Sequence, residues 1–203
     1  TVVSKLEQAG AVCLGKTNLD QFATGLNGTR SPYGPCTSAF NSDFISGGSS
    51  SGSAVSVSLH QVCFSIGTDT GGSGRIPASL NNVVGLKPTC GTLSTEGLVP
   101  CCPSVDCPSV FALSVADAIE VASIALDSER PDASLRSDVQ RSTFSLAPDD
   151  SVASILAPSD DDLEFFGNDE GKSLYLNFLC QLDQSGLELK RFDFAPFHEA
   201  GNL

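Results

Sequence analysis

Two clusters rich in glycine and serine, separated by a short apolar stretch, constrain what this chain can fold into. The first is Ile45-Ser-Gly-Gly-Ser-Ser-Ser-Gly-Ser53, and the second is Ile66-Gly-Thr-Asp-Thr-Gly-Gly-Ser-Gly-Arg-Ile-Pro-Ala78. Glycine permits turns that other residues avoid and lets the backbone approach a ligand closely. Composition alone would also fit two flexible linkers, but each cluster adjoins an apolar segment and charged residues interrupt the second. We therefore interpret the pair as a serine-dependent acyl-transfer site, with Ser49 and Ser73 as its key serines.

The composition allows a packed core and narrows the class of partner. The 203 residues are 40% hydrophobic and carry a net charge of −13, which provides enough apolar material for one domain or a large part of one. Nucleic acids and anionic membranes bind basic surfaces, so this acidic chain predicts neither as a partner. No apolar run is long enough to span a bilayer.

The chain has eight cysteines, and we expect them to be free thiols in a reducing cytoplasm. Cys13 and Cys63 lie in apolar, strand-like stretches where buried thiols fit well. Three further cysteines, Cys101, Cys102 and Cys107, lie close together in the sequence, but no second pair of cysteines with matching spacing and no histidine lies near them. The sequence therefore predicts no zinc site there.

The spacing of apolar residues predicts alternating helices and strands. Helices are expected over residues 2–8, 19–24, 53–60, 75–81, 114–126 and 169–184. Strands are expected over residues 11–14, 62–66, 83–86, 152–156 and 187–194, with an ordered loop over 26–48 and a polar excursion over 127–150. In the last helix, Leu174, Phe178 and Leu182 are expected on the packed face. This alternation is typical of a layered α/β fold with a mixed or parallel sheet.

Two short motifs in these clusters point to other hydrolases. Gly48-Ser-Ser-Ser-Gly52 matches the nucleophile elbow of α/β-hydrolases, which needs a general-base histidine later in the chain. Only His60 and His198 are present, at a predicted helix end and near the chain end. Asp69-Thr-Gly71 matches the short signature of aspartic proteases, but two such loops must meet to share a proton, and the sequence has one.

Together, the clusters resemble those of the amidase signature family. The similar stretches are Gly47-Gly-Ser-Ser-Ser-Gly-Ser-Ala54, Gly67-Thr-Asp-Thr-Gly-Gly-Ser-Gly-Arg-Ile-Pro-Ala78 and Val84-Gly-Leu-Lys-Pro-Thr89. Flanks such as Thr17-Asn-Leu-Asp-Gln-Phe-Ala-Thr-Gly25 and Asp106-Cys-Pro-Ser-Val-Phe-Ala112 are most similar to the allophanate hydrolase branch. The resemblance implies a layered mixed sheet flanked by helices. It also implies that residues 1–203 are a partial amidase domain, incomplete at both ends.

The resemblance implies roles for residues by position. Ser73 corresponds to the acylated nucleophile. Ser49, which a cis peptide bond precedes in the family, corresponds to the serine that passes a proton between Ser73 and a lysine base. The backbone N–H groups of Thr70, Gly71 and Gly72, with that of Ser73, correspond to the oxyanion hole. The remaining implied residues are Ser50, Asp69 and Arg75 as supports and Thr24 and Gly25 as substrate contacts.

The catalytic lysine of the family corresponds to a position upstream of residue 1. Lys5 and Lys16 precede the first cluster but match other positions. A lysine base must be neutral and therefore desolvated, and neither local sequence indicates that. Residues that orient the substrate are expected beyond Leu203 as well.

The function that the resemblance implies is hydrolysis of an amide bond by serine acylation, without a metal or an organic cofactor. The expected substrate is allophanate, cleaved to ammonia and carbon dioxide in urea degradation. A urea carboxylase, separate or fused, and a second copy of the chain in a homodimer are the expected protein partners. The alternatives are a general amidase, the glutamine-hydrolysing subunit of a tRNA amidotransferase, and a catalytically inactive fragment that binds an amide or a partner protein.

Overall fold

The strand β3 (Pro108–Ala112) is buried along its whole length and organises the first part of the chain. It pairs antiparallel with β1 (Phe64–Thr68) on one side and with β2 (Val84–Leu86) on the other. The structure is a computed structural model that describes residues 1–126 and 154–201. The chain forms two compact units, residues 1–146 and 147–203, and the three-stranded sheet belongs to the first.

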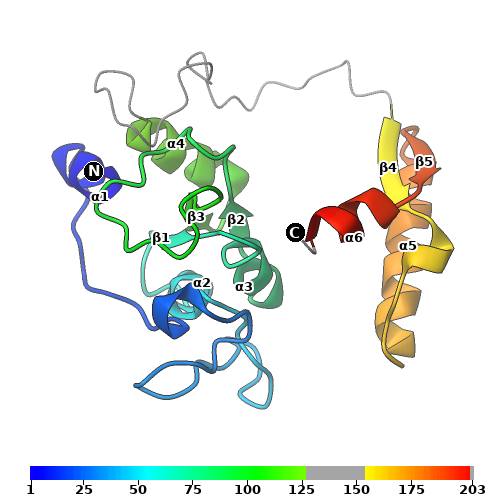
Figure 1. Cartoon of the computed structure of the whole chain (residues 1–203), viewed down its shortest axis with the longest axis horizontal. Coiled ribbons are helices and arrows are strands. Elements are labelled where there is room, and N and C mark those ends of the chain that lie inside the picture. The colour runs from blue at the N-terminus through cyan, green and yellow to red at the C-terminus, as the bar shows by residue number, and fades with distance from the viewer. Residues whose placement is uncertain (127–153, 202–203) are drawn as a thin grey trace. The chain divides into compact units, whose positions relative to one another are not determined.

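Two pairs of helices cover the two faces of this sheet (Figure 1). The first face packs against α4 (Val115–Ala125), which in turn packs against α1 (Val2–Gln8). The other face packs against α2 (Ser51–Ser58) and α3 (Arg75–Leu80). Because side chains alternate along a strand, Val110 and Ala112 of β3 belong to the core on the first face, and Phe111 belongs to the second.

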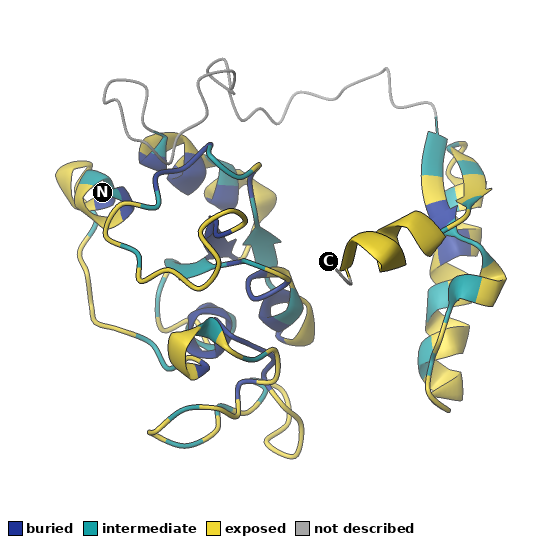
Figure 2. Cartoon of the chain, viewed as in Figure 1, coloured by how far each residue is buried: buried dark blue, intermediate teal, exposed yellow. Residues whose placement is uncertain are grey.

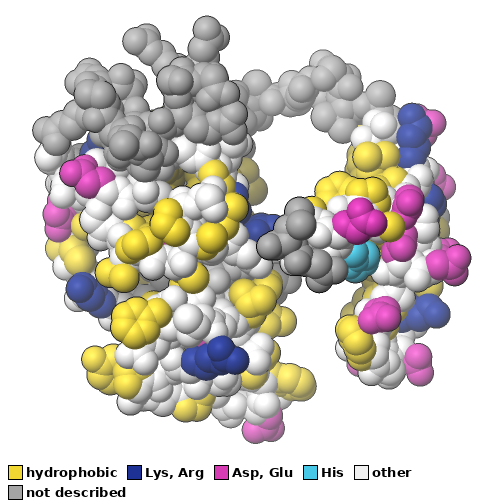
Figure 3. Space-filling view, viewed as in Figure 1, with side chains coloured by type: hydrophobic (Ala, Val, Ile, Leu, Met, Phe, Trp, Pro, Cys, Tyr) yellow, Lys and Arg dark blue, Asp and Glu magenta, His cyan; other side chains and the backbone are white. Residues whose placement is uncertain are grey.

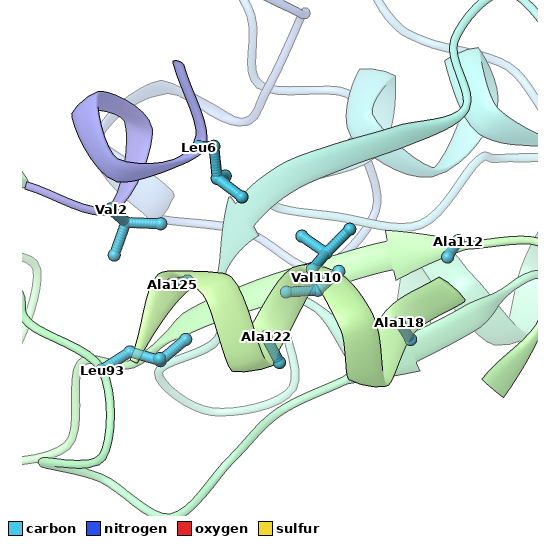
Figure 4. Packing of buried hydrophobic residues seen from close by; sticks show 9 residues of the cluster. Val2, Leu6, Leu93, Val110, Ala112, Ala118, Ala122 and Ala125 are labelled. Carbon is cyan, nitrogen blue, oxygen red and sulfur yellow. The ribbon is translucent and has the colours of Figure 1, made fainter. Parts of the chain in front are cut away.

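The first face is closed by an apolar core (Figure 4). Small side chains on α4 let that helix approach the sheet closely, and Ser114 caps it by accepting a hydrogen bond from the Asp117 N–H at 3.1 Å. The buried members of this core are Val2, Leu6, Leu93, Val110, Ala112, Ala118, Val121, Ala122 and Ala125.

The second face has a smaller apolar cluster, which consists of Ala54, Val57, Ala78 and Phe111. The rest of this face is polar: the serines and glycines at the start of α2 are buried (Figure 2). The loops that carry the two sequence clusters therefore lie on this face, at the N-terminal ends of α2 and α3.

The second unit has a two-stranded parallel sheet, β4 (Ser154–Pro158) and β5 (Glu188–Phe192). Between the strands run the short 3-10 helix η2 (Asp160–Asp162) and the long helix α5 (Asp169–Gln184), and α6 (Ala195–Gly201) follows. Acidic side chains outnumber basic ones in this unit (Figure 3).

Most of the predicted elements are confirmed to within two residues, and so is the α/β class. The sheet differs in one respect: the described residues form one antiparallel and one parallel sheet, where one mixed or parallel sheet was expected. Strand β3 and helices η2 and α6 were not predicted. The polar excursion predicted for residues 127–150 lies outside the described residues.

Two predicted elements near the N-terminus are wrong. Residues 11–14 form no strand, and Val12 is 80% exposed, because no strand of the described residues pairs with this segment. The cysteines predicted to be buried, Cys13 and Cys63, are exposed. In place of a helix over residues 19–24 there is a single 3-10 turn, η1 (Gln21–Ala23), in which Phe22 has a φ of 55°. Its left-handed backbone cannot continue a helix.

The packed face of α5 is rotated from the predicted one. Leu179 is buried and Leu182 is half-buried, whereas Leu174 and Phe178 are exposed. Only one side of this helix faces the two strands of its unit, so the other apolar side chains have no cover within the described residues. None of the helices in the described residues is long and apolar enough to cross a membrane.

Candidate active site

Ser49 and Ser73 lie on two adjacent loops and are almost completely buried, with exposed fractions of 1% and 3%. Ser49 precedes α2, and Ser73 precedes α3 in the loop that follows β1. The Ser50 N–H donates to the Ser73 carbonyl at 3.2 Å and joins the two loops directly. The Gly48–Ser49 peptide bond is cis, as the family resemblance implies.

Ser50 connects the start of α2 to the end of β1. Its hydroxyl donates to the Thr68 carbonyl and accepts from the Thr68 N–H, both at 3.0 Å. The space between them is tight, because a Cβ on Gly67 would lie 2.5 Å from Ser50 Oγ. These contacts hold the start of α2 against the end of β1.

Asp69 and Arg75 close the second loop on itself. The fully buried Asp69 carboxylate accepts from Arg75 Nε at 2.8 Å, from Arg75 Nη2 at 3.0 Å and from the Arg75 N–H at 3.0 Å. Burial alone would raise the pKa of Asp69, but the hydrogen bonds from Arg75 and Gly72 and the charge of Arg75 outweigh it, so the pKa lies below its ordinary value. The pair therefore shapes the turn that presents Ser73.

The backbone of this turn has three N–H groups without an acceptor among the residues that the structure describes. Within the part of the chain that the structure describes, the N–H groups of Thr70, Gly71 and Ser73 make no recorded hydrogen bond. The Gly72 N–H, which was also predicted for the oxyanion hole, donates to Asp69 Oδ1 at 2.7 Å. Gly72 has a φ of +124°, whereas a Cβ on Gly71 would meet no atom within 4 Å, so open space lies beside Gly71.

Asp106 is a buried carboxylate that the sequence analysis did not assign to the site. It accepts from the Thr70 hydroxyl at 2.5 Å and from the N–H groups of Cys101 and Cys102 at 2.9 and 3.1 Å. Burial raises the pKa of Asp106, but these three hydrogen bonds lower it more, and the net shift is downward. The one signal in the sequence was its place at the start of Asp106-Cys-Pro-Ser-Val-Phe-Ala112, a stretch that resembles the family.

Asp20 anchors the first loop in a comparable way and was also missed. Its N–H donates to the Ser49 carbonyl at 3.0 Å, and its fully buried carboxylate accepts from the N–H groups of Gly28 and Arg30 at 3.0 and 2.7 Å. A Cβ on Gly48 would lie 2.1 Å from Asp20 Oδ2. The glycine before the cis bond is therefore required by the close approach of Asp20.

Thr24 and Gly25, the predicted substrate contacts, lie in the segment next to these loops. The next residue, Leu26, accepts the Gly48 N–H at 2.7 Å, and its side chain lies near Gly72. Thr24 itself is exposed and donates to the Gln21 carbonyl at 2.8 Å. No recorded contact in the described residues joins Thr24 or Gly25 to Ser73.

Two lysines of the first unit donate hydrogen bonds to backbone carbonyls that belong to neither serine loop. Lys5 Nζ donates to the Leu126 carbonyl at 2.6 Å, and Lys87 Nζ donates to the Pro88 carbonyl at 3.2 Å. Lys16 is exposed. In the described residues, no group of three or more His, Cys, Asp or Glu side chains is placed to bind a metal ion.

Comparison with known proteins identifies several relatives. Urea amidolyase from Saccharomyces cerevisiae is 44% identical over 200 residues, which are 98% of this chain and 11% of that protein. One subunit of the mitochondrial glutamyl-tRNA(Gln) amidotransferase of Drosophila pseudoobscura pseudoobscura is 52% identical over 128 residues, 60% of this chain and 25% of that protein. The chain therefore spans about a tenth to a quarter of these relatives.

Solved structures confirm the expected fold. The allophanate hydrolase of Kluyveromyces lactis superposes with a TM-score of 0.83 at 43% identity, over 96% of this chain and 31% of that one. The corresponding amidotransferase subunit from Thermotoga maritima gives 0.82 at 32% identity, over 95% of this chain and 42% of that one. The family model described as Amidase matches residues 1–202. The chain therefore belongs to the amidase family.

Proposed function

We propose that this chain carries the two catalytic serines of an amide hydrolase that acts on allophanate. The observation that supports it most is that Ser49 and Ser73 are buried on two loops that the hydrogen bond from the Ser50 N–H to the Ser73 carbonyl joins. Beside them lie three N–H groups that have no acceptor among the described residues. The choice of allophanate rests on the flanking sequence and on the similarity to urea amidolyase and allophanate hydrolase over nearly the whole chain.

In the first step, Ser73 Oγ attacks the carbonyl carbon of the terminal amide. Its proton passes through the Ser49 hydroxyl to a neutral lysine, which the family resemblance puts upstream of residue 1. The N–H groups of Thr70, Gly71 and Ser73 donate hydrogen bonds to the carbonyl oxygen and stabilise the negative charge that develops on it. One such donor is worth about 3 kcal/mol in an acyl transfer. In this proposal Gly72 shapes the turn, because its N–H is committed to Asp69.

In the second step, the carbon–nitrogen bond breaks and the leaving nitrogen takes the proton back from the lysine through Ser49, so that ammonia departs. The substrate acyl group is then an ester of Ser73. A water molecule, deprotonated along the same path, hydrolyses this ester and regenerates the Ser73 hydroxyl. The released carboxylated product loses carbon dioxide. No electrons are transferred, and the family resemblance implies no metal or organic cofactor.

The other predicted residues complete this proposal as positioning groups. Ser50 holds the Ser49 loop, and Asp69 with Arg75 holds the Ser73 turn. Thr24 and Gly25 stay assigned to the substrate side, since the segment they belong to adjoins Gly48 through Leu26.

The surroundings of this site are part of the proposal too. Both compact units belong to one partial amidase domain, because the family model extends over residues 1–202. A urea carboxylase is the proposed source of allophanate. This chain covers 31% of the allophanate hydrolase chain of Kluyveromyces lactis but only 12% of the urea amidolyase chain of that organism. The urea amidolyase chain is therefore much longer and contains a large additional part. Eight free cysteines favour a reducing compartment such as the cytoplasm.

The experiment is to measure ammonia release from allophanate by the complete protein that contains this chain, beside Ser73→Ala and Ser79→Ala. Ser79 is exposed on α3 and serves as the matched control, because its loss removes a hydroxyl without touching the site. Loss of activity in Ser73→Ala alone supports both the substrate and the nucleophile. Activity of Ser73→Ala equal to that of Ser79→Ala would overturn the assignment of Ser73.

Glutamine is the second candidate substrate, and one observation favours it. The amidotransferase subunit from Drosophila is 52% identical over 128 residues, or 60% of this chain, and this identity exceeds the 44% found for urea amidolyase over 200 residues. Ammonia release from glutamine but not from allophanate, abolished by Ser73→Ala, would move the assignment to that enzyme class.

A further inference from the structure

Four of the eight cysteines lie between β2 and β3, in or beside the connection of residues 87–107. Within this connection, each of two cysteine thiols donates a hydrogen bond to a backbone carbonyl near the other cysteine. Cys90 Sγ donates to the carbonyl of Val105, two residues before Cys107, at 3.4 Å. Cys107 Sγ donates to the carbonyl of Pro88, two residues before Cys90, at 3.3 Å. These reciprocal contacts bring the two ends of the connection side by side, with one thiol on each.

The two thiols have different environments. Cys107 is completely buried, whereas Cys90 is half-exposed and lies 3.6 Å from Lys87 Nζ. The ammonium group is placed to stabilise the hydroxide that leaves when the Cys90 sulfur attacks the O–O bond of a peroxide. Burial raises the pKa of the Cys107 thiol to about 12, and the adjacent Cys90 thiol contributes to this rise. Because Cys90 is accessible and Cys107 is buried beside it, a soluble oxidant reaches Cys90 first, and Cys107 is the neighbouring thiol that can react with the product.

We propose that Cys90 and Cys107 are a redox pair that a peroxide converts to a disulfide. In the first reaction, Cys90 sulfur attacks one oxygen of hydrogen peroxide, the O–O bond breaks, and a sulfenic acid and water form. In the second, Cys107 sulfur attacks the sulfenyl sulfur, the S–O bond breaks, and the thiol proton leaves with the hydroxide as water. Two thiols lose two electrons in total, and the peroxide gains them.

This disulfide would form at a point that is coupled to the nucleophile turn. The Cys107 carbonyl accepts the Asp69 N–H at 2.8 Å, and the preceding residue, Asp106, accepts the Thr70 hydroxyl. A movement of Cys107 toward Cys90 therefore displaces Asp69 and Thr70, at the start of the turn that leads to Ser73. Loss of amidase activity on oxidation rests on the proposed function, whereas formation of the bond does not.

The test is to expose the intact protein to hydrogen peroxide, block the remaining thiols by alkylation, and map disulfides by peptide mass spectrometry. We expect a peptide cross-linked between Cys90 and Cys107 that dithiothreitol removes. Cys180→Ser is the matched control, because Cys180 is an exposed thiol in the other unit. The cross-link is expected in that variant and absent in Cys90→Ser. Lys87→Gln is expected to slow its formation severalfold.

Three results would overturn the proposal. One is alkylation of both thiols after peroxide treatment, and another is a disulfide from Cys90 to Cys101 or Cys102. The third is an equal rate of cross-linking in the wild type and Lys87→Gln, which would contradict the assignment of Cys90, beside the Lys87 ammonium group, as the thiol that attacks the peroxide. The activity assay is separate: if the Cys90–Cys107 bond is mapped but the reduced protein releases no ammonia, the proposed function fails and the redox pair stands.

Discussion

The two faces of the three-stranded sheet are held together by different forces. On the face covered by α1 and α4, nine buried apolar side chains pack together. On the face covered by α2 and α3, the apolar cluster has four members, and buried serines and carboxylates surround it. The first face gains stability from burial, which is strong but not directional. The second gains less from burial and depends on hydrogen bonds, which fix direction.

This difference explains why the two serines lie where they do. Each polar anchor of the second face joins segments that are distant in sequence: Ser50 with Thr68, Asp69 with the main chain of Cys107, and Asp20 with Ser49. Leaving one partner of such a buried pair unsatisfied costs about 1–3 kcal/mol. The arrangement therefore has few alternatives, and variants on the two faces should fail in different ways.

The largest effect is expected from Gly48→Ala. The added Cβ would lie 2.1 Å from Asp20 Oδ2 and 2.7 Å from the Gly28 nitrogen, and neither can retreat without breaking the hydrogen bond between them. We expect a loss of about 4 kcal/mol or more in the free energy of unfolding, measured by denaturant titration. Gly71→Ala is the matched control, with an expected change below about 0.5 kcal/mol because its Cβ meets no atom. Equal losses in both would contradict the steric account.

Leu93→Ala tests the apolar face alone. Leu93 is fully buried against α1, α4 and the sheet, so its truncation is expected to cost about 3 kcal/mol. Because no polar anchor of the site touches it, ammonia release per folded molecule should stay at the wild-type value. The measurement is denaturant titration together with the initial rate, corrected for the folded fraction. A lower rate at full folding would show that the two faces are coupled after all.

Asp69→Asn tests the polar face at nearly constant volume. It removes the negative charge that accepts hydrogen bonds from Arg75 and from two backbone N–H groups. Since the Arg75 side chain is 57% exposed, the attraction between the two charges contributes little to the free energy of unfolding. We expect a loss of about 2 kcal/mol in the free energy of unfolding, mainly from the buried hydrogen bonds. The rate should fall further than the folded fraction, unlike in Leu93→Ala. A normal rate in a fully folded Asp69→Asn protein would show that the Asp69 carboxylate is dispensable for the turn.

The same residue predicts a direction for pH dependence. The pKa of Asp69 is lowered in the folded state, so the unfolded chain binds more protons at acidic pH. Its contribution to stability is therefore complete above the ordinary aspartate pKa of about 3.9 and is lost as the pH falls below it. Asp69→Asn should flatten this acid loss in a urea titration series, whereas Asp43→Asn, at an exposed carboxylate, should leave it as in the wild type.

The comparison of faces also explains how far the sequence could be read. Local signals predicted α2, α3 and α4, because apolar spacing and caps lie within each segment. Strand β3 was missed because proline is disfavoured in a central strand, and Pro108 occupies the first residue, where such a strand tolerates it. Asp20 and Asp106 were missed for another reason. Their partners lie 4 to 36 residues away: backbone N–H groups such as those of Arg30 and Cys102, and the Thr70 hydroxyl. No local pattern specifies such contacts.

The smallest effect is expected at Ser109, the exception on the polar face. Its Oγ is buried and has no hydrogen-bond partner in the described residues, and it lies where a Cβ on Gly74 would approach to 2.8 Å. A buried hydroxyl without a partner destabilises the folded state by its desolvation free energy, and removing the hydroxyl removes that penalty. Ser109→Ala should therefore leave the free energy of unfolding unchanged or raise it by up to about 1 kcal/mol.

Ser50→Ala is the informative partner for that measurement. Ser50 is buried on the same face, but its hydroxyl makes two hydrogen bonds to Thr68, so its loss should cost about 1–2 kcal/mol. If the two alanine variants lose equal stability, the Ser109 hydroxyl has a partner in solution and the polar face is satisfied throughout. If Ser109→Ala is neutral while Ser50→Ala is destabilised, the hydroxyls on this face stabilise the fold only where they join the two loops. Gly74 would then be kept small by Ser109, directly behind the nucleophile, for reasons of space alone.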